Sequence, residues 1–139
     1  MTATTNIHPD RIGSLLAEKG YEVSEQGKDV LRIRDLASGI ALQAVLAGDI
    51  LFFSLTCATA PSASVTAAIM RKMLAADNGI STSHFQLYDQ GNGTTAITLN
   101  NFCKLQDMGP EDEDDILSCV NFLLVDVLAA SRLIGGTLK

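Results

Sequence analysis

Basic residues are few in this sequence and are nowhere clustered. Lys and Arg number 10 against 16 Asp and Glu among 139 residues, which gives a net charge of −6. Nucleic acid phosphates and anionic membrane surfaces attract proteins through clustered Lys and Arg. We therefore expect neither nucleic acid nor a membrane among the partners of this acidic chain.

Cysteine is also scarce. Cys57, Cys103 and Cys119 are an odd number of thiols and lie far apart in the sequence. A disulfide framework needs paired cysteines, and a zinc site needs closely spaced ligands. The sequence therefore predicts three reduced thiols in the core and no structural metal.

Motifs that carry known chemistry are missing as well. His8 and His84 are the two histidines, and neither belongs to a metal-ligand motif. The Gly-Asn-Gly segment at 91–93 is too short for a phosphate-binding loop and leads into a strand pattern, so we interpret it as a turn. No catalytic residue, cofactor or metal ligand is predicted. A small enzyme that uses Cys57, Cys103 or a histidine in a site formed only by folding stays an open alternative.

Targeting and membrane signals are weak. Residues 1–10 contain neither a basic nor an apolar region, so no secretory signal is predicted and the cytoplasm is the expected compartment. The apolar run 39–60 is about long enough to cross a bilayer. Gly48 and Asp49 interrupt it as a hairpin turn would, because an aspartate at the bilayer centre is costly. We interpret this run as two strands.

The acidic run 111–115, Glu-Asp-Glu-Asp-Asp, directly follows Pro110. Consecutive helical side chains point in different directions, and the spaced ligands of a calcium loop are missing. Carboxylates at a helix start interact favourably with unpaired backbone N–H groups and with the helix dipole. The run therefore predicts the start of a helix rather than a cation site.

The apolar pattern predicts a single domain over residues 1–139 with an α+β fold. The expected elements are a helix at 9–20, a hairpin or bent strand at 21–34 with a turn at Gly27, strands at 40–46 and 50–57, a helix from Pro61 to Asn78-Gly79, a hairpin at 85–99, and a helix at 116–134 closed by Gly135-Gly136. The 50–57 strand is apolar on both faces, which is typical of a central strand. The architecture expected is an antiparallel sheet flanked by helices in the order α-β-β-β-α-β-β-α.

The last two helices carry more apolar residues than one core needs. In the last helix a core stripe is expected at Ile116, Val120, Leu123, Val127, Ala130 and Ile134, widened by Leu117, Leu124 and Leu128. A second apolar face contains Phe122, Val125, Ala129 and Leu133. In the preceding helix Ala67, Met70 and Leu74 lie beyond the stripe of Val65, Ile69, Met73 and Ala76. These second faces predict an interface, most simply in a symmetric homodimer, unless each helix is sandwiched within one chain.

The pattern as a whole resembles the type III secretion chaperone-like fold, which is shared by class I effector chaperones of the Tir chaperone type and YbjN-type regulators. The resemblance covers nearly the whole chain. It rests on the element order, the Gly27 turn, Pro61 before the second helix, Leu74 and Asn78 at its end, the Phe85–Leu99 hairpin and the long helix after Pro110. It implies a homodimer built through the second helix and the neighbouring hairpin, and no enzymatic activity.

Two functions follow from this resemblance. The first is a dimeric, non-enzymatic domain that holds an extended segment of a partner protein through apolar contacts and strand edges, as class I chaperones do. The second is a YbjN-like regulatory or stress-related domain that binds no secreted effector. The small enzyme named above is the third alternative.

Overall fold

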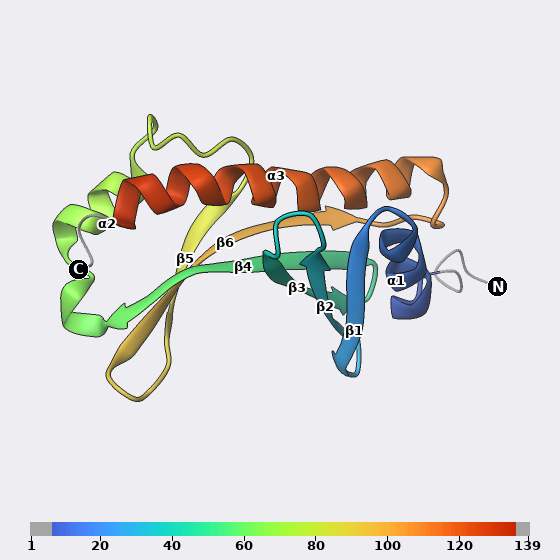
Figure 1. The fold of residues 1–139 in the computed structure, drawn as a ribbon, viewed down its shortest axis with the longest axis horizontal. Coiled ribbons are helices and arrows are strands. Elements are labelled where there is room, and N and C mark those ends of the chain that lie inside the picture. Colours follow the sequence, from blue (N-terminus) through green and yellow to red (C-terminus); the bar gives the residue numbers. More distant parts are fainter. Residues whose placement is uncertain (1–6, 136–139) are drawn as a thin grey trace. The chain divides into compact units, whose positions relative to one another are not determined.

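The computed structural model describes residues 7–135 of the chain, which fold into three α-helices, six strands and one short 3₁₀ helix (Figure 1). In chain order these are α1 (Pro9–Glu18), β1 (Tyr21–Gly27), β2 (Val30–Asp35), β3 (Ala41–Ala47), β4 (Ile50–Pro61), η2 (Ser62–Ser64), α2 (Ala67–Leu74), β5 (His84–Asp89), β6 (Thr94–Lys104) and α3 (Pro110–Gly135). The predicted α+β class is confirmed. Four strands separate the first two helices, one more than the order expected from the sequence. Gly136 lies outside the described residues.

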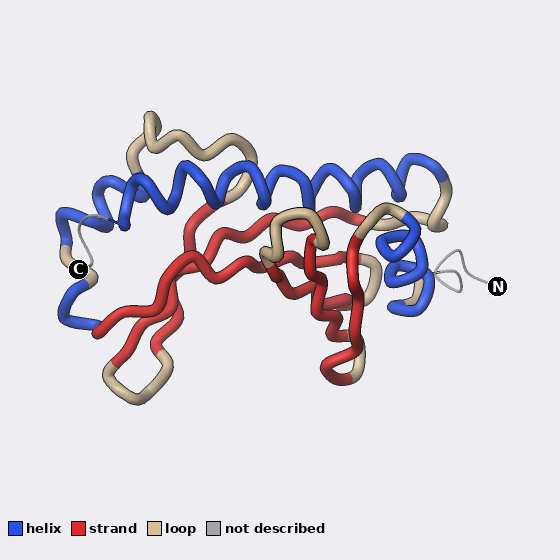
Figure 2. Tube along the Cα trace, in the orientation of Figure 1, coloured by secondary structure: helices blue, strands red, loops and turns tan. Residues whose placement is uncertain are grey.

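The strands form one antiparallel sheet in the order β1-β2-β3-β4-β6-β5 (Figure 2). The first hairpin forms as a pair of strands rather than one bent strand, with Tyr21 opposite Asp35 and an irregularity between Glu25 and Gly27. The second hairpin aligns Phe85 with Leu99 and Leu87 with Ile97, as the alternation of apolar residues predicted.

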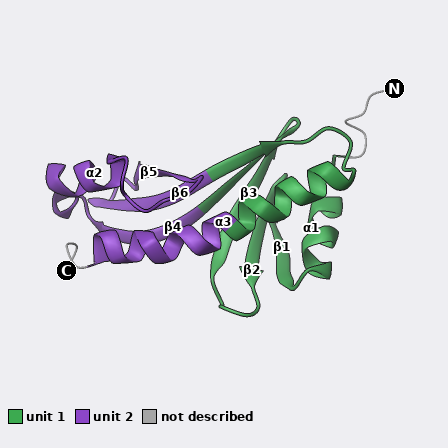
Figure 3. Cartoon of the chain, turned by 90° about the horizontal axis from the view of Figure 1, so that it is seen from above, with its two compact units in different colours: residues 1–54, 101–121 green, residues 55–100, 122–139 purple. Residues whose placement is uncertain are grey.

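The chain divides into two compact units, and β4, β6 and α3 each contribute residues to both (Figure 3). Unit 1 contains residues 7–54 and 101–121, and unit 2 contains residues 55–100 and 122–135 among those described. Each unit has its own buried apolar residues. The single domain over residues 1–139 stays a prediction.

The core of unit 1 follows from strand alternation. One face of β2, β3 and β4 is buried, and its apolar residues include Leu31, Ile33, Leu42, Ala44, Leu46, Leu51 and Phe53. Helix α1 buries Ile12, Leu15 and Leu16, and α3 buries Ile116 and Val120 in this unit. Gly20 has a φ of 97°, a left-handed conformation that suits glycine and lets the chain turn from α1 into β1.

The apolar run 39–60 forms a hairpin, as predicted. β3 pairs with β4 so that Leu46 lies opposite Leu51, and Gly48 in the turn has a φ of 65°. The expectation that β4 is buried on both faces is wrong at one position: Phe53 is 1% exposed but its neighbour Phe52 is 44% exposed. The described helices cover only the face that carries Phe53 in this unit, which leaves Phe52 in contact with solvent.

The second helix starts later than Pro61, where the sequence placed its start. Pro61 ends β4, and α2 begins after Thr66, whose hydroxyl oxygen accepts a hydrogen bond from the Ile69 N–H at 3.3 Å. This side chain caps the helix, which proline cannot do. The predicted end at Asn78-Gly79 is also wrong, because α2 stops at Leu74 and Ala76 lies beyond the helix. The Asn78 side chain donates to the Met73 carbonyl at 2.5 Å.

The core of unit 2 joins α2, β6 and α3. Ile69, Met73, Ile97 and Ile134 are buried together, and Cys57, Ala58, Val65, Met70, Phe85 and Leu133 pack against them. In this unit α3 also buries Leu123, Val127 and Ala130, as its predicted core stripe requires, but Leu128 is 59% exposed and does not widen that stripe. Leu128 lies on the opposite side of the helix from Ala130, so the core cannot reach it.

Helix α3 begins at Pro110, as the acidic run predicted. Within that run, Asp112 is buried and one of its carboxylate oxygens accepts hydrogen bonds from the N–H groups of Gln106, Asp107 and Met108 at 2.7 to 2.9 Å. Helix α3 is long and apolar enough to cross a membrane. Core helices of soluble proteins can have the same length and composition, so this is weak evidence for a membrane span. Asp112 and Asp126 are both buried along it.

Candidate interaction surfaces

The outward face of the sheet in unit 1 carries three exposed apolar side chains in adjacent strands. Val45 on β3, Phe52 on β4 and Phe102 on β6 are 36%, 44% and 59% exposed. Val45 lies directly opposite Phe52 in the strand register, and the Phe52 and Phe102 rings are 6.0 Å apart at their centroids. We call these three residues the sheet stripe.

Strand alternation fixes the position of the sheet stripe. Each member has a buried neighbour on the opposite face, namely Ala44 beside Val45, Phe53 beside Phe52 and Cys103 beside Phe102. The buried residues hold the register, so the stripe is set by the core behind it. An exposed apolar patch of this kind is typical of an interaction site.

The sequence analysis did not single out the sheet stripe. Adjacent apolar residues at 52 and 53 were interpreted as one buried strand, because burial on both faces gives the same pattern as burial on one face and binding on the other. The same holds for Phe102 in β6: its apolar character fits both a buried position and an exposed binding position.

Cations lie around the sheet stripe. Arg32 and Arg34 are on the same outward face of β2, and Lys104 follows Phe102 by two residues on β6. Arg34 forms an ion pair with Glu22 at 3.6 Å, and Lys104 forms one with Asp49 at 4.0 Å.

The interface residues predicted on the two later helices all belong to unit 2. Of those on α2, Leu74 is 79% exposed, Ala67 is exposed, and Met70 packs partly against the unit 2 core. On α3, Phe122 and Val125 are exposed, and Leu133 packs partly against the same core as Met70. We call the exposed residues of this set, together with Leu128, the helix surface, namely Ala67, Leu74, Phe122, Val125 and Leu128.

A loop covers part of the second apolar face of α3. A Cβ placed on Gly79 would lie 3.6 Å from the Cβ of Ala129, and Ser81 is held by Asp126 through two hydrogen bonds. Because this loop comes from the same chain, it supplies some of the burial that a partner was expected to supply. Ala129 is accordingly only half-buried rather than open.

Strand β5 is the edge of the sheet next to β6, and five of its six residues are exposed. On its outward face the Tyr88 hydroxyl donates to the Gln86 side chain at 2.5 Å, and Gln86 contacts His84 at 3.3 Å. Edge strands present main-chain groups that can pair with an added strand. β5 therefore offers a second mode of contact with a polypeptide.

Two of the three thiols meet in unit 1. Cys103 of β6 and Cys119 of α3 share a side-chain hydrogen bond, and the Cys119 thiol also contacts the Phe102 carbonyl at 3.7 Å. The hydrogen bond from Cys103 lowers the pKa of Cys119, and the same bond with burial raises the pKa of Cys103. Burial raises the pKa of Cys57 in unit 2 to about 11.

The sequence analysis placed all three thiols in the core but did not pair Cys103 with Cys119. Cys103 is buried, whereas Cys57 and Cys119 are half-buried. In the structure Asn101 and Cys103 share the inward face of β6, and Asn101 donates to the Cys119 carbonyl at 2.9 Å, so the pair depends on contacts between β6 and α3 that the sequence did not indicate. Among the hydrogen bonds of residues 7–135, none joins a cysteine to a histidine.

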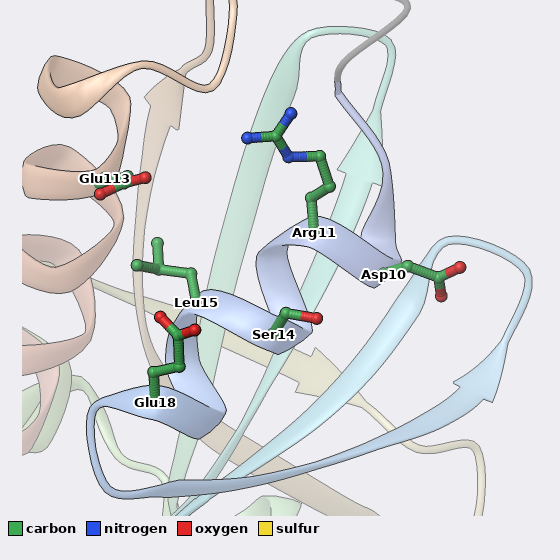
Figure 4. A pocket seen from close by; sticks show the side chains of 6 residues that line it. All are labelled: Asp10, Arg11, Ser14, Leu15, Glu18 and Glu113. Atoms are coloured by element: carbon green, nitrogen blue, oxygen red, sulfur yellow. The ribbon is translucent and has the colours of Figure 1, made fainter.

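A shallow cavity beside α1 is lined by Asp10, Arg11, Ser14, Leu15, Glu18 and Glu113 (Figure 4). Glu113 comes from α3 and the others come from α1, so three carboxylates share the cavity with one guanidinium. Nowhere in the part of the chain that the structure describes do three or more His, Cys, Asp or Glu side chains form a group that could hold a metal ion.

No family model and no curated protein sequence matches the chain. Solved structures do match it. YbjN, a proposed transcription regulator from E. coli, is 17% identical with a TM-score of 0.64 over 88% of this chain and 90% of that chain. A chain of the heterodimeric complex ExoU–SpcU from the type III secretion system of Pseudomonas aeruginosa is 19% identical, with a TM-score of 0.57 over 89% of this chain and 95% of that one.

These likenesses show the fold. The chain has the α+β type III secretion chaperone-like fold that the sequence pattern suggested, and it shares this fold with a regulator-type protein and with part of a secretion complex.

Proposed function

We propose that this chain is a non-enzymatic protein-binding domain that acts in the cytoplasm as a homodimer and holds an extended segment of a partner protein. The observation that carries the proposal is the sheet stripe of Val45, Phe52 and Phe102. Two of its members are aromatic, and aromatic side chains supply much of the binding energy of protein interfaces.

The sheet stripe suits a polypeptide better than a small molecule. It runs across three adjacent strands, which lie about 4.8 Å apart, and so spans about 10 Å of open sheet. Small ligands bind in concave sites that cover most of their surface. An extended segment instead needs a row of apolar contacts, and because both phenylalanines are already about half-buried, covering one of them contributes about 1 kcal/mol.

The helix surface supports self-association. Leu74 at the end of α2 and Val125 and Leu128 on α3 are large apolar residues that are more than half exposed. A second copy of the chain could bury the same residues on both protomers, which is the usual arrangement in a two-fold dimer. Ala67, Met70, Phe122, Ala129 and Leu133 complete the proposed interface.

A YbjN-like regulatory role is the second candidate. It is supported by the TM-score of 0.64 to YbjN against 0.57 to the secretion complex chain. Under this role the dimer would form but no secreted protein would be held. The two candidates therefore differ in whether the dimer holds a secreted protein.

Co-purification from the native host with quantitative mass spectrometry tests the proposal. The chain should return with one polypeptide in constant stoichiometry, and the double variant Phe52→Ser/Phe102→Ser should lose it. Leu36→Ser is the matched control, because Leu36 is an equally exposed apolar residue of unit 1 outside the sheet stripe. Recovery of the chain alone, or binding that survives the double variant, would contradict the proposal.

A further inference from the structure

The charge around the sheet stripe differs from that of the chain as a whole. The chain carries a net charge of −6, yet the outward face of unit 1 carries Arg32, Arg34 and Lys104. Glu22, opposite Arg34, is the acidic residue of that face on β1. The surface that is open for binding is therefore the place where the chain is locally cationic.

Two of the three cations already have acidic partners. The Arg34–Glu22 and Lys104–Asp49 pairs are the ion pairs formed by the described residues, and Arg32 belongs to neither. The residues opposite Arg32 in the neighbouring strands are Ser24 on β1 and Gln43 on β3, which are both uncharged. Within residues 7–135, therefore, no carboxylate forms an ion pair with the Arg32 guanidinium.

Arg32 stands within reach of the sheet stripe. Gln43 lies opposite Arg32, Val45 follows Gln43 by two residues on the same face, and Phe52 lies opposite Val45. Diagonal neighbours of this kind in a sheet are about 7 to 8 Å apart at their Cα atoms, a span that a long side chain crosses. A segment that covers Val45 and Phe52 therefore places its next side chain near the guanidinium.

We propose that the segment held on the sheet stripe is acidic, with apolar side chains over Val45, Phe52 and Phe102 and a carboxylate bound by Arg32. This inference rests on the proposed function, because it specifies the partner of the same surface. Arginine binds a carboxylate through two parallel hydrogen bonds, which gives geometric selectivity as well as affinity. Lys104, two residues after Phe102 on β6, adds a second cation. Its nitrogen lies 4.0 Å from the Asp49 carboxylate, so it can also bind a carboxylate of the segment.

The remaining surface of the chain sharpens this selection. The three cations of this face, together with their acidic partners Glu22 and Asp49, carry a net charge of +1, which leaves −7 for the rest of the chain. An acidic segment is repelled by most of the surface and attracted at one face, which fixes where it binds. A basic segment would be attracted to the acidic remainder of the surface and repelled near the sheet stripe, so it would not be held in one position there.

Phage display of a random dodecapeptide library on the immobilised full chain tests the inference. The wild-type chain should enrich peptides that combine Phe, Leu, Ile or Val with Asp or Glu. Arg32→Glu should weaken the best of these peptides about tenfold or more, which is the loss expected for one charge-assisted pair. A library selected on Arg32→Glu should lose its preference for Asp and Glu. Arg71→Glu, a change of the same charge at an exposed position on α2 in unit 2, should leave affinity and selection unchanged.

The outcomes separate this inference from the proposed function. Loss of all enrichment in Phe52→Ser/Phe102→Ser supports the sheet stripe as the binding surface, whatever the charge of the peptides. Enriched peptides without acidic bias, or an acidic bias that Arg32→Glu does not alter, would overturn the inference and leave the proposed function standing. No enrichment on the wild type, together with self-association that the Phe52→Ser/Phe102→Ser variant abolishes, would make a second copy the occupant and overturn the inference as well.

Discussion

Ser81 donates two hydrogen bonds to one carboxylate oxygen of Asp126, from its backbone N–H at 3.0 Å and from its hydroxyl at 2.9 Å. Asp126 is only 2% exposed, so this buried charge depends on a loop residue 45 positions earlier in the chain. The contact holds the segment between α2 and β5 against α3 within unit 2. It explains why a face of α3 that looked open in the sequence is partly covered.

Asp126→Ala should therefore destabilise the chain by about 1 to 3 kcal/mol, because the Ser81 N–H loses its acceptor and the loop loses its anchor. Urea unfolding followed by circular dichroism measures the change. Asp77→Ala, at an exposed position in the same segment, should alter stability little. Equal stability of Asp126→Ala and the wild type would mean that the loop is held by other contacts.

Asp112→Ala should be among the most damaging single changes in the acidic run. Three backbone N–H groups that precede α3 share this buried carboxylate, and their loss should cost about 2 to 4 kcal/mol in the free energy of unfolding. Asp114→Ala, in the same run but exposed, is the matched control and should cost little. Similar effects of the two changes would refute a specific role for Asp112.

Leu74→Glu should dissociate the proposed homodimer. Leu74 is 79% exposed, so the substitution cannot disturb a packed core, but it would bury a carboxylate in a two-fold interface. Multi-angle light scattering at micromolar concentration should show a dimer for the wild type and a monomer for the variant. Ala76→Glu adds the same charge beyond the end of α2 and should leave the dimer intact. A wild-type chain that is monomeric throughout this range would count against the dimer.

The thiols should differ in their reaction with iodoacetamide, because the thiolate is the reactive form. The pKa of Cys119 is lowered by its hydrogen bond from Cys103, whereas burial raises the pKa of Cys57 to about 11. At pH 8 Cys119 should be labelled before Cys57, as peptide mass spectrometry can measure. Cys103→Ala removes the hydrogen bond, so the pH midpoint for labelling of Cys119 should move upward. An unchanged midpoint would show that the thiol pair does not set the reactivity of Cys119.

Element types were largely predictable from this sequence, because strand and helix periodicities differ and the turn residues are distinctive. The hairpin between Phe85 and Leu99 and the helix after Pro110 are both confirmed. The start of the second helix was predicted wrongly, since Pro61 suits a helix start and a strand end equally well. The capping contact of Thr66 with Ile69 decided between them.

The binding surface was harder to predict, because it depends on which face of each strand the helices cover. Phe52 and Phe102 have the same apolar character as the core residues beside them, and only the folded arrangement distinguishes their exposure. The thiol pair had the same difficulty, since Cys103 and Cys119 are brought together by the packing of β6 against α3 within unit 1. Spacing along the chain carries no information about either.

Phe52 and Phe53 are neighbours on β4 that face opposite sides of the sheet. A change at position 53 opens a cavity and should be eliminated by loss of stability, whatever the chain binds. A change at position 52 costs the fold little and is tolerated or rejected by the partner alone. Across descendants of this chain, position 53 should therefore stay fixed, whereas position 52 should change when the ligand changes. A shift in specificity could then evolve through substitutions that leave folding untouched.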